Sequence, residues 1–143
     1  MISILPLASA SPKTVDEMNA LARELHLEGT ADVTLERVNE MLATPNVILL
    51  TVQDEGAVIG MATLHITPTI EDCIGHVDDV VVSSAYRGQG LGEKLMRALI
   101  EAAKKRGVSS LHLTSRPARV AAQALYMKVG FKKRETDVFK LSL

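Results

Sequence analysis

The segment AYRGQGLGEKLM, from Ala85 to Met96, carries three glycines at alternate positions directly before a helical pattern. Glycine loses more conformational freedom on folding than any other residue, so Gly88, Gly90 and Gly92 should meet a requirement that other residues cannot. Main-chain amides in such a turn, beside the N-terminus of a helix, form a site for a phosphate group. A tight turn that needs glycine for its geometry alone is the alternative interpretation.

Two familiar phosphate-binding loops do not fit this segment. The dinucleotide fingerprint G-x-G-x-x-G would need glycine at position 93, where the chain has Glu93. A P-loop would need Gly-Lys followed by Ser or Thr, but Gly92 is followed by Glu93 and Lys94. What remains is the pattern R-x-x-G-x-G formed by Arg87, Gly90 and Gly92.

With this pattern the chain resembles the GNAT superfamily of acetyl-CoA-dependent N-acetyltransferases. DDVVVSSAYRGQGLGEKLM resembles the strand, loop and helix that bind pyrophosphate in that superfamily, and AAQALYMKVGF resembles its later A-x-x-L-Y-x-K-x-G-F segment. The order of predicted strands and helices also matches the superfamily fold. The resemblance implies acetyl-CoA as the acetyl donor, with main-chain amides of the glycine turn on its pyrophosphate and a β-strand along its pantetheine arm. The residues implied in donor binding are Val80, Val81, Val82, Arg87, Gly88, Gln89, Gly90, Leu91, Gly92, Arg119 and Tyr126.

Tyr126 is our candidate for the acid that protonates the departing thiolate. The ordinary pKa of tyrosine, about 10, lies near that of a thiol, so proton transfer between them is nearly balanced. Tyr126 shares a predicted helix face with Arg116, Arg119 and Gln123, and a surface or packing tyrosine is the alternative. Many superfamily members carry Asn where this chain has Arg119. The two arginines therefore either meet an anionic group of the donor or acceptor, or form a solvated basic face.

Candidates for the base lie in CIGHVDDVVV, where alternation places His76, Asp78 and Val80 on one face and Val77, Asp79 and Val81 on the other. Two adjacent carboxylates are costly to bury in a sheet, so we expect at least one of them to face the active-site cleft. His76 has a pKa near neutral and could accept the proton of the amine through water, or it could be an ordinary hydrogen-bonded sheet histidine.

The acceptor is predicted to be a primary amine of a small molecule. We expect this amine to attack the donor directly in a ternary complex, because no motif places a base beside Cys73 that would activate it for a thiol intermediate. The segment CIGHVDDVVVSSAYRGQGLGEKLM is similar to glucosamine-phosphate N-acetyltransferases, which makes an amino-sugar phosphate one alternative. A protein or peptide amine and a non-catalytic acyl-CoA-binding module are the others. We expect the acceptor cleft to include residues 26–34, where Glu28 would attract a cationic amine or be an ordinary loop carboxylate.

Hydrophobic periodicity predicts one α+β domain over residues 1–143, with α/β/α layers. Helices are expected after a capping box of Thr14 and Glu17, from about Thr34 to Pro45, from the glycine turn to Gly107, and from Ser115 and Pro117 to Gly130. Strands are expected at residues 2–7, 46–53, 57–67, 74–84, 109–115 and 131–143. The result is a mixed, mostly antiparallel sheet of about six strands flanked by about four helices, as the resemblance also implies.

Composition excludes several classes of protein. A net charge of −1 gives no basic field for nucleic acid or for an anionic membrane surface. The single cysteine, Cys73, cannot form an internal disulfide and fits a reducing compartment, so the chain is expected to be cytoplasmic, with its N-terminus a strand and not a signal peptide. His26, His65 and His112 lack the spacing of metal ligands, so no metal is expected. A homodimer is common in the superfamily, and the sequence leaves it open.

Overall fold

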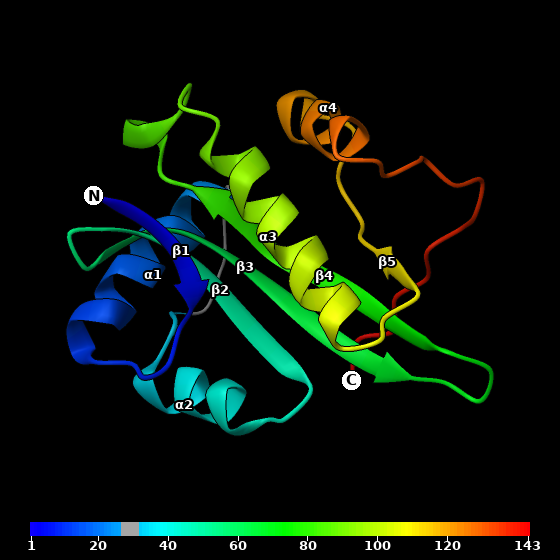
Figure 1. Cartoon of the computed structure of the whole chain (residues 1–143), viewed down its shortest axis with the longest axis horizontal. Helices are drawn as coiled ribbons and strands as arrows, with labels where there is room; N and C mark the ends of the chain where they lie inside the picture. Colours follow the sequence, from blue (N-terminus) through cyan, green and yellow to red (C-terminus); the bar gives the residue numbers. More distant parts are fainter. Residues whose placement is uncertain (27–31) are drawn as a thin grey trace.

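The computed structural model describes residues 1–26 and 32–143, and in these residues the chain forms a five-stranded sheet between helices (Figure 1). The strands follow the order β1-β2-β3-β4-β5; the first three pairs are antiparallel and the last pair is parallel. Their bounds are β1 Ile2–Pro6, β2 Val47–Asp54, β3 Ala57–Pro68, β4 Cys73–Val82 and β5 Ser110–His112. The helices are α1 Pro12–Leu25, α2 Leu35–Ala43, α3 Leu91–Lys105 and α4 Val120–Lys128, with a short 3₁₀ turn, η1, at Ser84–Tyr86. The predicted α+β layers are confirmed.

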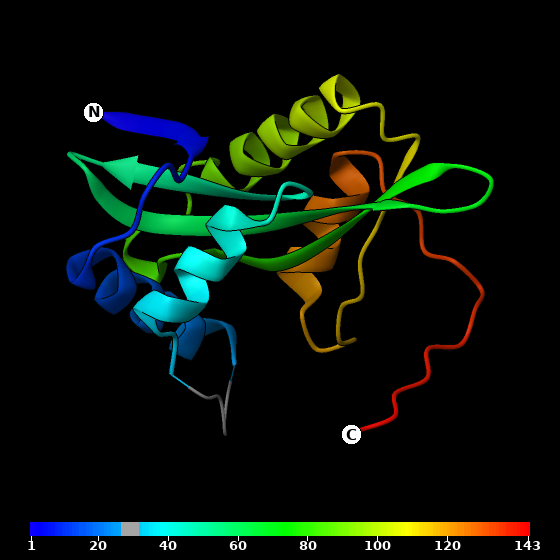
Figure 2. The same cartoon turned by 90° about the horizontal axis from the view of Figure 1, so that it is seen from below.

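Two hydrophobic clusters hold the layers together, one on each face of the sheet (Figure 2). α3 covers one face because Leu91, Leu95 and Leu99 recur at i, i+4 spacing and are buried against the sheet. α1 covers the other face with Val15, Met18 and Leu21, and α2 packs beside it. Each described helix is too short or too polar to cross a lipid bilayer.

Two predicted helix starts were wrong. α1 begins two residues before Thr14, because Ser11 is the N-cap and forms the capping box with Thr14. α4 begins at Val120 and not at Ser115, since residues 116–119 form a turn closed by the amide of Arg119 and the carbonyl of Arg116 at 3.0 Å. Proline disfavours the helical region for the residue before it, which keeps Arg116 out of the helix.

The predicted last strand, residues 131–143, is absent from the sheet. β5 is also shorter than expected, because only Ser110–His112 pairs with β4 and the chain then leaves the sheet. A strand is stable only where its main-chain groups find partners, and residues 132–143 pair with none of the described strands. The sheet therefore has five strands where about six were expected.

β4 does not keep strict alternation. Its pairing with β3 shifts register between Met61 and Thr63, and Asp79 takes a left-handed φ of 57°. Such a bulge turns the following residues to the other face. Val77 therefore packs on the α3 side and Val81 on the α1 side, so the prediction that they share a face was wrong.

Candidate active site

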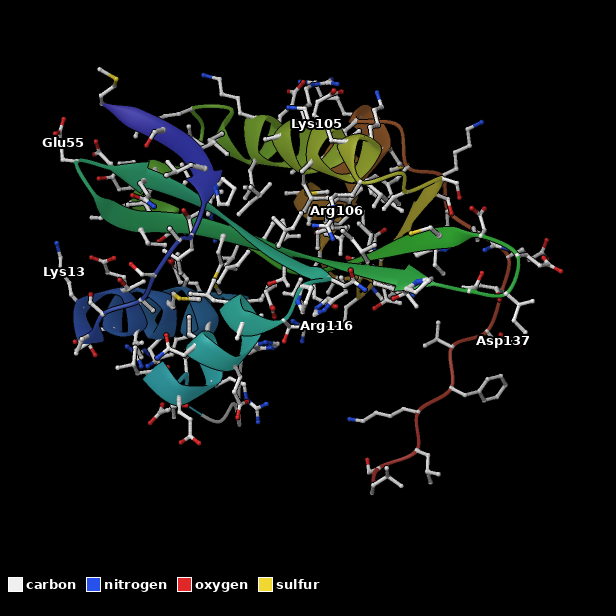
Figure 3. The ribbon with its side chains drawn as sticks, turned by 60° about the horizontal axis from the view of Figure 1, so that its bottom comes forward. Lys13, Glu55, Lys105, Arg106, Arg116 and Asp137 are labelled. Atoms are coloured by element: carbon white, nitrogen blue, oxygen red, sulfur yellow. The ribbon has the colours of Figure 1, made fainter. Side chains whose placement is uncertain are left out.

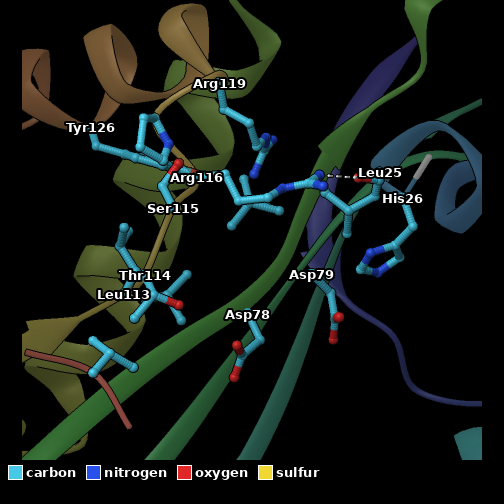
Figure 4. Close-up of a pocket in the computed structure, with 14 residues that line it drawn as sticks. Leu25, His26, Asp78, Asp79, Leu113, Thr114, Ser115, Arg116, Arg119 and Tyr126 are labelled. Carbon is cyan, nitrogen blue, oxygen red and sulfur yellow. Dashed lines mark hydrogen bonds between the residues drawn. The ribbon is translucent and has the colours of Figure 1, made fainter. Parts of the chain in front are cut away.

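A cavity of about 480 Å³ opens beside β4, where the sheet splays apart (Figure 4). β4 and β5 pair only from Ile74 to His76, so the outer edge of β4 from Val77 onward faces this cavity and not a neighbouring strand. The walls come from the bulge of β4, the segment after β5, the end of α1, α4 and Val138 of the C-terminal segment. The lining residues used below are His26, Asp78, Asp79, Ser115, Arg119 and Tyr126.

Tyr126 enters the cavity from α4 and is 5% exposed. Burial raises the pKa of its hydroxyl, and the charge of nearby Arg119 opposes part of that rise. A raised pKa keeps the phenol protonated at neutral pH, the state that a proton donor needs. The ring of Phe131 meets the Tyr126 ring edge-on at 6.0 Å between centroids and fixes its orientation.

Both aspartates of β4 line the cavity and both remain exposed, so neither carboxylate suffers burial. The hydroxyl of Thr63 donates a hydrogen bond of 3.0 Å to Asp79. Asp78 lies 3.4 Å from Nε2 of His65. The bulge allows this arrangement, because it lets two consecutive side chains reach the same cavity.

His76 lies outside the residues that line the cavity. Its exposed ring faces the ring of His112 on β5, with 5.8 Å between the centroids. The structure therefore brings Asp78, Asp79 and Tyr126 together and leaves the third candidate base beside them on the sheet.

Ser115 is a site residue that the sequence did not reveal. It was expected to start a helix, but α4 begins later and has no side-chain cap. Among the described residues, its buried hydroxyl finds no hydrogen-bond partner, although it lines the cavity. A buried hydroxyl without a partner is costly, and a bound ligand would remove that cost. No sequence pattern marks such a residue.

Positive charge gathers at one end of the cavity. Arg116 and Arg119 line it, and the guanidinium of Arg116 donates a long bond of 3.4 Å to the Leu25 carbonyl (Figure 4). His26, at the end of α1, lines the same end. Of the predicted acceptor segment 26–34, residues 27–31, including Glu28, lie outside the described residues.

The glycine turn forms a second hollow, of about 350 Å³, between the start of α3 and α4. Gly88 and Gly90 take left-handed φ values of 80° and 72°, which glycine adopts without strain. Gly92 instead allows close packing, because a Cβ there would lie 3.1 Å from the Leu125 side chain on α4. The three glycines thus serve two different purposes.

Main-chain amides face this hollow without helical partners. The first bond of α3 runs from the Lys94 amide to the Gly90 carbonyl at 3.1 Å, so the amides of Leu91, Gly92 and Glu93 come before it. Unpaired amides at a helix N-terminus attract an anion. A negatively charged group such as a phosphate could therefore bind in this hollow.

Lys128 and Glu93 join the two walls of this hollow. Lys128 on α4 lies 2.8 Å from one carboxylate oxygen of Glu93, and Arg97 lies 2.9 Å from the other. Both cations, Lys128 first, lower the pKa of Glu93. Lys128 therefore ties α4 to the start of α3 at the rim of the glycine turn, with Glu93 balancing its charge.

The other predicted donor-binding residues lie on β4, after η1 and at the glycine turn. Val80 and Val82 pack on the α3 side of the sheet and Val81 on the other side. Arg87 follows η1, and its charge contributes, after hydrogen bonding by Ser84, to the lowered pKa of Glu24. Gln89 is exposed at the tip of the turn.

Comparisons with known proteins agree with this geometry. A family model described as the Acetyltransferase (GNAT) family matches residues 15–131. The chain is similar to a glucosamine 6-phosphate N-acetyltransferase of Trypanosoma brucei brucei, at 35% identity over 60% of this chain and 58% of that protein. It is also similar to an L-2,4-diaminobutyric acid acetyltransferase of Marinococcus halophilus, at 35% identity over 60% of this chain and 49% of that protein. The chain thus spans about half the length of these two relatives.

A solved structure shares the whole fold. An acetyltransferase of Trypanosoma brucei superposes with a TM-score of 0.78 at 26% identity, over 100% of both chains. The two relatives described above act on an amino sugar phosphate and on an amino acid, according to their names. Similarity of this degree therefore identifies the family but not the acceptor. The acceptor has to be inferred from the residues that line the cavity.

Proposed function

The chain belongs to the GNAT family of acetyltransferases, and on that premise we propose that it transfers the acetyl group of acetyl-CoA to a primary amine of a small molecule. The observation that carries the proposal is the position of the two hollows. α4 lines both the glycine turn and the Tyr126 cavity, and β4, which lines the Tyr126 cavity, leads through η1 into the glycine turn. One extended ligand can reach both.

In this proposal the donor lies along the outer edge of β4. Main-chain amides of Gly88–Gly92 hold its pyrophosphate, and the main chain of Val80–Val82 pairs with its pantetheine arm like another strand. Arg87, Gln89 and Arg119 contact the donor from either side. Two observations support this assignment: the free amides at the start of α3 and the hydroxyl of Ser115, which has no partner among the described residues.

Bound in this way, acetyl-CoA supplies a thioester carbonyl that an amine can attack. The amine nitrogen bonds to the carbonyl carbon, the carbon–sulfur bond breaks, and the amine loses a proton while the sulfur gains one. Tyr126 donates the proton to the sulfur, since burial keeps its phenol in the protonated form that a donor needs. A main-chain N–H of β4 near the bulge stabilises the oxyanion.

Asp78 and Asp79 attract the amine and accept its proton, directly or through water. Both carboxylates are exposed in the cavity, and Thr63 fixes the position of Asp79. His76, outside the cavity, would relay the proton to solvent. Of the three candidates for the base, the two aspartates are favoured over His76 because they line the cavity.

The cavity favours an acceptor that also carries a negative group. Arg116 and Arg119 lie at one end of the cavity, and the two aspartates lie on β4. The arginines can therefore bind an anionic group while the aspartates bind the amine. An amino acid fits this pattern. An amino-sugar phosphate is the second candidate, favoured by the relative from Trypanosoma brucei brucei.

The test is release of free thiol from acetyl-CoA over a panel of amines. The panel contains amino acids and diamino acids, glucosamine with and without its 6-phosphate, and a peptide with a free N-terminus. We expect turnover with a small amine, and a lower KM for the anionic member of each matched pair. Activity confined to the peptide would overturn the small-molecule acceptor. Binding of coenzyme A without thiol release for any amine would indicate a non-catalytic module.

A further inference from the structure

β3 carries two side chains that approach the aspartates of the cavity. Thr63 and His65 lie two residues apart on this strand. Leu64 and Ile66, which alternate with them, pack in the core cluster on the α3 side of the sheet. Thr63 and His65 therefore project from the opposite face of the sheet, where each of them meets a carboxylate of β4.

The two side chains contact different aspartates. In the pairing of β3 with β4, Thr63 lies opposite Asp78 and His65 lies opposite His76. His65 and Asp78 are thus diagonal neighbours on one face, with Nε2 of the imidazole 3.4 Å from Oδ2 of the carboxylate. Asp79, at the bulge, instead accepts the hydroxyl of Thr63 at 3.0 Å. Catalytic pairs are often as long as the His65 contact until a substrate binds.

The two contacts differ in chemistry. Thr63 is fully buried, and its hydroxyl can hold Asp79 but does not change charge near neutral pH. The side chain of His65 is 38% exposed, and an imidazole can be neutral or charged near neutral pH. A neutral imidazole donates one N–H and fixes the carboxylate, whereas an imidazolium also stabilises its negative charge and makes it a poorer proton acceptor. The two aspartates of the cavity are therefore not equivalent.

On the basis of the acetyl transfer proposed above, we infer that His65 is a positioning residue that makes Asp78 the base. The Nε2–H of His65 donates to Oδ2 of Asp78, which leaves Oδ1 to accept the proton that the amine loses when its nitrogen bonds to the thioester carbonyl carbon. The proton then passes to solvent, because the Asp78 side chain is 58% exposed. Asp79 keeps its hydrogen bond from Thr63 and supplies negative charge beside the amine. Below about pH 6.5, where imidazole is ordinarily charged, the reaction should slow because Asp78 becomes a weaker base.

Other titratable groups near this pair come from several elements. β2 places the uncharged Val47 opposite His65, and β4 places His76 on the other side. The charged and titratable side chains that line the cavity with Asp78 are His26, Asp79, Arg116 and Arg119. All of them remain when only His65 is replaced. A changed pH dependence in a His65 variant therefore reports on His65.

Charged side chains of α1 and α2, on the same face of the sheet, have partners of their own. Glu17 on α1 lies 3.8 Å from Lys13. Arg37 on α2 lies 3.1 Å from Glu40. Figure 3 shows Lys13 at the start of α1, well separated from Arg116 at the cavity. These ion pairs also remain in a His65 variant.

The first test compares the kinetics of two variants, with an amine that the natural chain acetylates. His65→Leu removes the donor and should lower kcat by about 10-fold or more, because a misplaced base loses rate, while the KM for acetyl-CoA stays unchanged. His65→Gln keeps an N–H donor and should retain most of the natural kcat near neutral pH. Glutamine does not titrate, so the ratio of its kcat to the natural kcat should rise as the pH falls from about 8 to about 5.5.

The matched control is His112→Gln on β5. His112 lies on the same face of the sheet, opposite His76, and its Nε2 lies 3.0 Å from the hydroxyl of Ser110. This variant should have the natural kcat at every pH. Thermal denaturation establishes that each variant is folded. A His65→Leu variant with the natural kcat, or a His65→Gln variant with the natural pH profile, would overturn the inference.

The second test identifies the aspartate through which His65 acts. Adding His65→Leu to Asp78→Asn should lower kcat no further, because the residue that His65 positions has already lost its function. Adding it to Asp79→Asn should lower kcat as much as in the natural chain. An equal further loss in both backgrounds would refute the role of His65 and leave the acetyl transfer intact. Absence of thiol release by the natural chain with every amine would instead refute both proposals.

Discussion

The two hydroxyls of the cavity differ in how the protein holds them. Tyr126 is buried, with a raised pKa, and is oriented by Phe131. Ser115 is buried without a partner among the described residues. The first arrangement prepares a proton donor, and the second leaves a donor that a ligand can satisfy. Each predicts a different response to removal of its oxygen.

Replacing Tyr126 with Phe should lower kcat by about 10²-fold or more, the usual effect of losing a general acid. The ring and its packing remain, so the Kd for coenzyme A should change little. Steady-state kinetics and calorimetry measure the two effects. The control is Tyr86→Phe, since Tyr86 donates its hydroxyl to Asp54 and lies outside both hollows. Equal activity of Tyr126→Phe and the natural protein would remove Tyr126 as the acid.

The raised pKa of Tyr126 also predicts the alkaline behaviour of kcat. The acid works only when protonated, and its folded pKa lies above the ordinary value of 10. The loss of kcat with rising pH should therefore begin above about pH 10. A pH profile at saturating substrates checks this. A decline below pH 9 that disappears in Tyr126→Phe would contradict it.

Replacing Ser115 with Ala should leave thermal stability unchanged or slightly higher, because the buried hydroxyl has no bond to lose. The KM for the donor or the acceptor should rise about 3- to 10-fold, corresponding to one hydrogen bond of about 0.5–1.5 kcal/mol. The control is Ser109→Ala, which removes a bond to Asp72 at 2.6 Å and should lower stability without affecting either KM. A less stable Ser115→Ala with both KM values unchanged would assign the hydroxyl a structural role.

At the scale of elements, the sequence predicted what local patterns determine. The i, i+4 leucines of α3 and the runs of strand-forming residues in β2 and β3 placed these elements within a few residues. The bulge of β4 escaped prediction, because a left-handed φ at Asp79 depends on pairing with β3 and not on residue type. The prediction of the final strand was wrong for a related reason. An alternating pattern shows that a segment can form a strand, but the strand forms only when it pairs with the edge of another strand.

The residues of the candidate site also fall into those that the sequence could predict and those that it could not. The glycine turn is a local motif, so its residues could be found in the sequence, and Tyr126 came with the second motif. Ser115 could not be found, because its significance is the absence of a bond in the folded chain. The separation of His76 from the cavity follows from its pairing with His112 on β5, because the cavity opens only beyond that pair.

The glycine turn can be tested against a second turn of the same geometry. Gly90 and Gly56 have φ values of 72° and 82°, and a Cβ at either would meet no atom within 4 Å. Gly90→Ala and Gly56→Ala should each destabilise the fold by about 1–2 kcal/mol, the cost of a left-handed alanine. Only Gly90→Ala should weaken coenzyme A binding in calorimetry. Equal affinity in both variants would contradict the assignment of the turn.

At the scale of the whole molecule, the proposed donor site joins parts that contact one another little elsewhere. The glycine turn begins α3 and α4 forms the opposite wall of its hollow, while α4 also lines the Tyr126 cavity beside β4. α1 and α2 pack on the other face of the sheet through a separate core cluster. Ligand binding should therefore stabilise α3, α4 and the end of α1 directly, and α2 only through the sheet.

Coenzyme A at a hundred times its Kd should raise the free energy of unfolding by about 2.7 kcal/mol. Thermal denaturation should show this as a higher Tm, and Gly90→Ala should lose most of the increase at the same ligand concentration. Hydrogen exchange should locate the effect, with slower exchange at residues 80–93 and in α4. Amides of α2 should change only as much as global stability requires, because α2 packs on the far face of the sheet. Protection spread equally over α2 and α4, or confined to α1 and α2, would mean that coenzyme A binds elsewhere.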